Sequence, residues 1–184
     1  MVSRRSKQSD LFLSKNRKLD SRFGGSDLTS NPKTARPIST KDTMHVVLKS
    51  VQARGPYSFL RYEQSLLKLL HKLALSMNVT LHDVVVMTNH IHLSLKVNSR
   101  RAFQNYLRAA SGLIARKVLG AQKHKPSLLR KFFSGRPFSR IVNSGRKSWR
   151  ALTEYFELNR LEKCGFSKSE SRAWNLLSRV LPDF

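Results

Sequence analysis

Two histidines separated by one residue, His90 and His92, have the residue type and spacing that suit a metal site. From His90 to Val97 apolar and polar residues alternate, which is the pattern of a strand with one buried face. Both imidazoles therefore project from the polar face, with Cβ atoms roughly 6 to 7 Å apart, twice the rise of a strand. Neutral imidazole is a common ligand of divalent metals, so the two rings can turn toward one cation. Pairs of ordinary surface histidines share this spacing, and the metal interpretation depends on the basic chain around the pair and a candidate nucleophile downstream.

The charge of the chain indicates a polyanionic partner. The 184 residues include 35 Lys and Arg but 11 Asp and Glu, a formal net charge of +24. Such an excess of positive charge destabilises a compact fold by repulsion between like charges, which indicates a polyanionic partner. Nucleic acid is the leading candidate, because each phosphate that is neutralised releases counterions. A structural role of the ribosomal type and an anionic membrane surface are the alternatives. No stretch reaches the roughly 20 apolar residues of a spanning helix, and the single cysteine, Cys164, fits a reducing cytoplasm.

Basic residues are concentrated between residues 122 and 150, with three phenylalanines among them. Single-stranded nucleic acid is held by charges on its backbone and by aromatic rings against its bases. The phenylalanines are equally compatible with core packing beneath a solvated charged rim. Including two lysines on predicted strands, the candidate DNA-binding residues are Lys49, Lys96, Arg130, Lys131, Arg136, Arg140, Arg146 and Lys147.

The elements that must position these residues follow from hydrophobic periodicity. Strands are predicted at 43–51, within 79–87, at 90–97 and at 138–143. Helices are predicted at 62–77, 100–119, 146–163 and 169–180. Strand, helix, strand, strand, helix, strand is the ferredoxin-like order of an α+β fold, a four-stranded antiparallel sheet with two helices on one face. The other face would carry His90 and His92, together with His45 and Lys49, and the helix at 146–163 could lie across or beside it.

The domain organisation is a basic arm followed by one domain. Residues 1–38 are rich in Ser, Lys, Arg, Asp and Gly, which predicts a flexible arm, and residues 39–184 form the domain with its C-terminal helices. In the helix at 146–163, Trp149, Leu152 and Phe156 form the predicted packing stripe. In the last helix, Trp174 and Leu177 are the predicted contacts.

Two motifs resemble those of the HUH endonuclease superfamily, in particular the REP-associated tyrosine transposases and their single-tyrosine transposase relatives. The segment 88–93, Thr-Asn-His-Ile-His-Leu, is similar to the family's Asn-His-hydrophobic-His-Leu motif. The segment 155–159 is similar to its Tyr-x-x-x-Asn element on the helix after the fourth strand. The resemblance covers roughly residues 35–165. Thr88 and Arg160 depart from it, since Pro is frequent at both positions in the family.

The resemblance implies a mechanism. His90 and His92 would hold Mg²⁺ or Mn²⁺, with the amide oxygen of Asn159 as a third ligand, and the metal would polarise the scissile phosphate. Tyr155 would attack to give a 5′-phosphotyrosine and a free 3′-hydroxyl. A phenol with a pKa near 10 is mostly protonated at pH 7, so it needs the metal, Lys49 or Lys96 nearby, or a base. Without the resemblance, the favoured interpretation of Tyr155 is a helix tyrosine packed beside Trp149 and Leu152.

The family would make this chain a transposase that cleaves and joins single-stranded or hairpin DNA, as a monomer or a homodimer. The alternative is a catalytically inactive, basic nucleic-acid-binding protein derived from such a transposase, whose binding would ignore EDTA and leave the strand intact. An RNA-binding protein of the ribosomal type is a third possibility.

Overall fold

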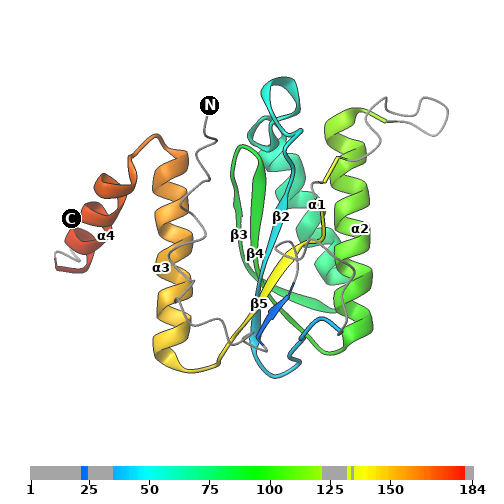
Figure 1. Ribbon diagram of the computed structural model, residues 1–184, viewed down its shortest axis with the longest axis horizontal. Helices are drawn as coiled ribbons and strands as arrows, with labels where there is room; N and C mark the ends of the chain where they lie inside the picture. The colour runs from blue at the N-terminus through cyan, green and yellow to red at the C-terminus, as the bar shows by residue number, and fades with distance from the viewer. Residues whose placement is uncertain (1–21, 25–34, 122–131, 134, 181–184) are drawn as a thin grey trace, which may run out of the picture.

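The computed structural model describes residues 22–24, 35–121, 132, 133 and 135–180. Within them lies a five-stranded sheet in which all neighbouring strands are antiparallel (Figure 1). The strand order is β1 (Phe23–Gly24), β5 (Phe138–Val142), β2 (Thr43–Lys49), β4 (His90–Val97) and β3 (Val79–Val86). From β2 to β5 the elements follow the predicted ferredoxin-like α+β order, which is confirmed. The extra strand, β1, comes from the segment predicted as a basic arm, most of which lies outside the described residues.

One face of the sheet is covered by α1 (Glu63–Ser76) and α2 (Arg100–Leu119), which lie side by side (Figure 1). Two short 3₁₀ turns, η2 (Gly55–Tyr57) and η3 (Phe59–Tyr62), precede α1. The helices form where apolar residues recur at three- and four-residue spacing, and these residues are buried against the apolar side of the strands. They are Leu66, Leu70 and Ala74 on α1, and Phe103, Tyr106, Leu107, Ala110, Ile114 and Val118 on α2.

The opposite face is covered by α3 (Arg146–Lys163), so the sheet lies between two helical layers (Figure 1). Leu152 and Phe156, two residues of the predicted packing stripe, are buried against Val85 and Val142 of the sheet. The third, Trp149, is 42% exposed and its ring contacts that of His82 instead. The helix carrying Tyr155 therefore lies across the face that carries His45 and His92.

The last helix, α4 (Lys168–Val180), does not pack through Trp174 and Leu177, so that prediction was wrong. Trp174 and Leu177 are 56% and 55% exposed, and the Trp174 ring lies near that of Phe166 at a centroid distance of 6.3 Å. The helix packs on α3 and not on the sheet, and among residues 168–177, whose side chains are described, the buried one is Ser171. An apolar stripe indicates which side of a helix could be buried, but burial requires a facing element.

No helix among the described residues is long and apolar enough to cross a membrane.

Ion pairs fix the C-terminal half of α3 against the rest of the domain. Arg160 pairs with Asp83 of β3 and, at 2.5 Å, with Glu157 on its own helix. Lys163 pairs with Glu63 of α1 at 2.6 Å. Partly exposed pairs of this kind each contribute about 1 kcal/mol or less, but together they set the position of α3 along the sheet. They also give Arg160, which departs from the family pattern, a structural role.

Candidate active site

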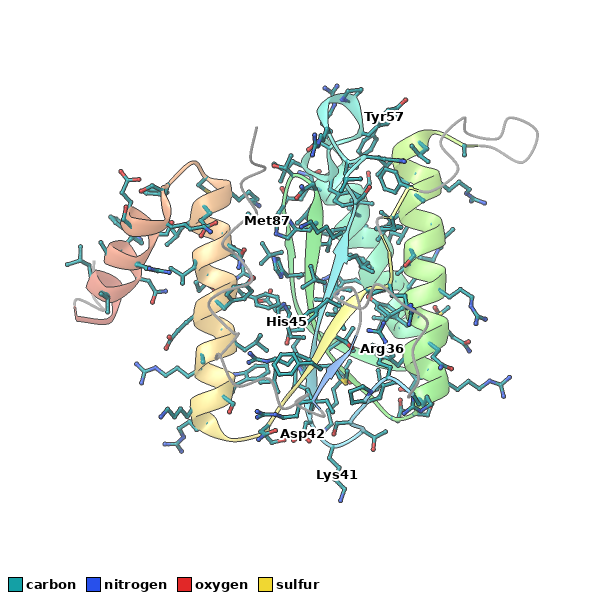
Figure 2. All side chains as sticks on the ribbon, in the orientation of Figure 1. Arg36, Lys41, Asp42, His45, Tyr57 and Met87 are labelled. Atoms are coloured by element: carbon teal, nitrogen blue, oxygen red, sulfur yellow. The ribbon has the colours of Figure 1, made fainter. Side chains whose placement is uncertain are left out.

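Three imidazoles lie on the sheet face beneath α3. Because β2 and β4 are antiparallel neighbours, His92 is paired across the strands with Val47, and His90 with Lys49. His45, two residues before Val47, lies on the same face, and Figure 2 shows it on the side of the sheet that faces α3. Its Nε2 is 3.1 Å from Nδ1 of His92. The rings of His90 and His92 meet edge to face with centroids 4.8 Å apart.

Hydrogen bonds leave the Nε2 atom of both predicted metal ligands for another partner. Nδ1 of His90 lies 2.8 Å from Oδ1 of Asn89, and since a carbonyl oxygen only accepts, Nδ1 carries the proton. The lone pair of His90 is therefore on Nε2. Nδ1 of His92 is bonded to His45, while its Nε2 is buried and has no hydrogen-bond partner within the described part of the chain.

Burial keeps these imidazoles neutral. It lowers the pKa of His45 to about 3, assisted by the charge of Arg140, and lowers the pKa of His90 to about 4, assisted by Lys49. The pKa of His92 falls well below its ordinary value because of burial and its two histidine neighbours. Neutral imidazole is the form that binds metals, so all three rings are in the ligand-competent state at pH 7.

The lowered pKa values predict that acid destabilises the fold. Below pH 6.5 the unfolded chain takes up protons at these histidines while the folded chain does not, so the free energy of unfolding falls between pH 6.5 and 4. Each buried histidine contributes a slope of up to about 1.4 kcal/mol per pH unit. Urea unfolding at several pH values measures it. The His45→Gln variant should show a shallower slope, and an unchanged slope would contradict the assignment.

Tyr155 lies over this cluster from α3. Its ring centroid is 5.3 Å from that of His92 and 5.5 Å from that of His45, with edge-to-face geometry in both cases. The side chain is half-buried, and burial raises the pKa of the phenol. A side-chain hydrogen bond with Asn159 and the charge of Arg140 both act to lower that pKa. The predicted nucleophile thus lies directly against a predicted metal ligand.

Asn159 follows Tyr155 by one helical turn and is 4% exposed. Its Nδ2 donates to the backbone carbonyl of Tyr155 at 2.6 Å. Because Nδ2 of Asn159 donates within α3, Oδ1 of Asn159 is the side-chain atom that suits a metal.

The donor set fits a divalent cation in part. No group of three or more His, Cys, Asp or Glu side chains that suits a metal occurs in the described ranges. One imidazole with its lone pair on Nε2, that of His90, and a second whose Nε2 is buried without a partner in the described ranges nevertheless fit a site completed by an amide oxygen and by oxygens from outside the chain. His90 and His92 stay the predicted ligands of Mg²⁺ or Mn²⁺, with the amide oxygen of Asn159 as the predicted third ligand.

The predicted DNA-binding residues are dispersed over the molecule. Lys49 is exposed next to His90, and Arg140 lies beside His45 on β5, so both border the cluster. The charge of Lys96 acts on Asp42 and His82, and the charge of Arg136 acts on Arg36, both away from the predicted metal ligands. Figure 2 shows Arg36 on the side of the sheet away from α3. Arg146 and Lys147 are exposed in the first turn of α3, and Arg130 and Lys131 lie outside the described residues.

The described phenylalanines divide between core and site. Phe132 is 5% exposed and packs with Phe133 against Phe59, so this pair belongs to the core and not to a nucleic-acid surface. Phe138 and Phe156 contact the His45 ring, at 6.4 and 5.5 Å between centroids. These contacts, and that of Asn89 with His90, were not recognised from the sequence. The adjacency of Asn89 and His90 was a signal for the latter.

Comparison with known proteins identifies the family and the fold. A family model described as "Transposase IS200 like" matches residues 39–159. The chain is similar to the structure of a REP-associated tyrosine transposase bound to a REP hairpin, with 15% identity, 72% of this chain and 74% of that chain covered, and a TM-score of 0.56. At that identity the likeness shows the fold. A crystal structure of a candidate transposase from Deinococcus radiodurans R1 also has 15% identity and covers 72% of this chain and 98% of its own, but its TM-score of 0.39 carries no argument. No curated protein matches this chain.

Proposed function

The chain belongs to the IS200-like transposase family, and we propose that it cleaves and rejoins single-stranded DNA through a covalent bond between Tyr155 and a 5′ phosphate. The observation that carries the proposal is the contact between the Tyr155 ring and His92, whose Nε2 is buried without a partner in the described structure. A phenol beside two neutral imidazoles is a donor set that suits metal-assisted phosphoryl transfer.

The proposed reaction exchanges one bond to phosphorus for another. The Tyr155 oxygen forms a bond to phosphorus, the bond between phosphorus and the 3′ oxygen breaks, and the phenolic proton is lost while the 3′ oxygen gains one. A bound Mg²⁺ or Mn²⁺ would polarise the phosphate and stabilise the charge that develops on it. Arg140 and the hydrogen bond with Asn159 favour the phenolate, against the effect of burial. The phosphodiester energy is retained in the phosphotyrosine, so the strand can be joined to a new 3′ end.

Single-stranded or hairpin DNA is the proposed substrate. The formal net charge of +24 suits a phosphate backbone, and the similar REP-associated tyrosine transposase is described as bound to a REP hairpin. The decisive experiment incubates the protein with a labelled DNA hairpin carrying single-stranded flanks and Mn²⁺. A protein–DNA adduct that survives denaturation is expected, and EDTA should abolish it.

An inactive DNA-binding protein is the second candidate function. Burial of His92 to 2% exposure beneath Tyr155 and Phe156 favours it, because a metal needs access to Nε2. This candidate predicts salt-sensitive binding that EDTA does not change, with no adduct on any hairpin.

His45 is expected to position His92 for the metal. In His45→Phe the Nδ1 atom of His92 loses its hydrogen-bond partner, and partners of this kind typically contribute 10- to 100-fold to metal affinity. Calorimetric titration with Mn²⁺ should therefore show a Kd higher by about 10-fold or more. His82→Phe, which changes a histidine in contact with Trp149, is the matched control. An unchanged Kd in His45→Phe would remove this role.

A further inference from the structure

A small polar cavity lies at the edge of the sheet, between β1, β5 and the first turn of α3. Its volume is about 130 Å³, and its lining includes Arg22, Phe23, Arg140, Asn143 and Ser148. None of the described lining residues is acidic. The nearby carboxylate of Asp42 accepts hydrogen bonds from the backbone and side chain of Ser144, at 3.1 and 2.7 Å. The lining of the cavity therefore includes two arginines and two neutral polar residues, Asn143 and Ser148.

Strand register connects this cavity to the catalytic residues. Phe23 is paired with Arg140 across β1 and β5, and Arg140 is paired with His45 across β5 and β2. The three side chains therefore form one row on the sheet face that α3 covers. The Arg140 guanidinium carbon lies 5.9 Å from the centre of the Phe23 ring. The charge of Arg140 also acts on both His45 and Tyr155, lowering the pKa of each group, so the cavity is within electrostatic reach of the nucleophile.

The contents of the cavity are limited by its size and lining. Pockets for whole small molecules usually measure about 300 Å³ or more, so a space of about 130 Å³ does not hold a complete nucleotide. Two arginines and a polar lining suit a single phosphate group. Phe23 is a half-buried residue of the lining, and its aromatic ring offers a surface on which a base can stack.

We propose that this edge cavity binds the phosphate of one unpaired nucleotide of the DNA strand that runs into the active site, beside Arg22 and Arg140, while the base of that nucleotide stacks outside the cavity against Phe23. The proposal rests on the proposed function, which brings a single strand to Tyr155. It assigns β1, from the N-terminal segment, to substrate binding. Without such a role, Phe23 would pack on Phe138, at 6.1 Å between ring centroids, and lie beside the Arg140 guanidinium.

Binding can be measured apart from cleavage. The full-length protein carrying Tyr155→Phe is titrated in EDTA against a fluorescent hairpin with a single-stranded flank, and anisotropy gives Kd. Phe23→Leu, which keeps an apolar contact with Phe138, is added to this background. Loss of one base stack should weaken binding about 5- to 100-fold. Arg140→Gln should reduce the salt dependence of log K by about 0.7, the contribution of one phosphate of a single strand.

An abasic scan identifies the nucleotide. One base at a time is removed from the single-stranded flank of the hairpin. The Kd of each of these hairpins is measured for the Tyr155→Phe protein with and without Phe23→Leu. At one position the effect of Phe23→Leu should vanish, because the stacking partner is already missing. Arg108→Gln, on the exposed side of α2, is the control and should show no such position dependence. Thermal unfolding of each variant confirms that it is folded.

The outcomes separate this proposal from the proposed function. Unchanged binding by Phe23→Leu, or a loss that is equal on every abasic flank, overturns the nucleotide site even when the wild-type protein forms the adduct. A position-specific loss supports the site even if the wild-type protein forms no adduct, in which case cleavage is what fails.

Discussion

Tyr155→Phe is expected to abolish the covalent protein–DNA adduct while leaving the fold and DNA binding intact. The substitution removes one oxygen atom, and with it the only nucleophile that the proposed reaction uses, so adduct formation should fall by about 10³-fold or more. Packing should survive, because phenylalanine keeps the ring whose centroid lies near those of His45 and His92. The measurement is denaturing electrophoresis of labelled hairpin DNA after incubation with Mn²⁺, with anisotropy for binding.

The chain offers a matched control in Tyr106, on the other side of the sheet. Tyr106 is fully buried on α2, and its hydroxyl donates to the carbonyl of Leu70 at 3.4 Å. Tyr106→Phe should lose about 0.5–1.5 kcal/mol of stability, the net contribution of one hydrogen bond, and should form the adduct normally. If Tyr155→Phe still forms adduct at the wild-type rate, Tyr155 is not the nucleophile.

Local sequence patterns predicted most strands and helices, because apolar residues recur in them with a clear strand or helix period. Alternation from His90 to Val97 is the observed extent of β4, and it placed both histidines on one face. Arg100–Leu119 and Arg146–Lys163 were predicted with the observed bounds, since capping by Ser99 and the left-handed Gly120 delimit α2. The position of α3 over the histidines was left open, because it depends on contacts between Phe156 and Val85 that are distant in sequence.

The site was less predictable because it depends on strand register and long-range packing. His45 was placed on the correct face by alternation, but its contact with His92 requires β2 and β4 to be neighbours in one register. The strand at Phe23 carries no periodic signal, since two residues cannot express one. Trp174 and Leu177 show the reverse error, in which an apolar stripe was assigned a partner that the fold does not provide.

The two departures from the family pattern have structural explanations. Thr88 acts through its backbone carbonyl, which accepts from the Phe59 amide at 3.0 Å and from the Ser58 hydroxyl at 3.3 Å. Any residue supplies that carbonyl, so a proline is not needed there. Arg160 uses its side chain to pair with Asp83, an ion pair that proline could not form. Both positions therefore stabilise the frame around the site without contributing a reacting atom.

His90→Ala is expected to remove metal binding and, with it, adduct formation. His90 is half-buried, so truncation costs less stability there than at the buried His92. Loss of a direct ligand should exceed the 10- to 100-fold effect typical of outer partners, so the Kd for Mn²⁺ should rise by about 100-fold or more. A metal supplies several kcal/mol of charge stabilisation at the phosphate, which corresponds to a rate loss of about 10³-fold. Calorimetry and the adduct assay measure the two effects separately.

His82→Ala provides the comparison, because it also deletes a strand imidazole but one that contacts Trp149 and not His92. Equal loss in both variants would mean that removal of any strand histidine disturbs the sheet. Loss in His90→Ala alone, reproduced by His92→Phe, would locate the metal on β4. Normal Mn²⁺ affinity in His90→Ala would contradict the metal assignment, since the free Nε2 of His90 is the more accessible of the two proposed donors.

Because the Asn89 contact holds the His90 ring with Nε2 unprotonated, Asn89→Ala should weaken Mn²⁺ binding in the same direction but by less, as expected when a ligand is loosened and not removed.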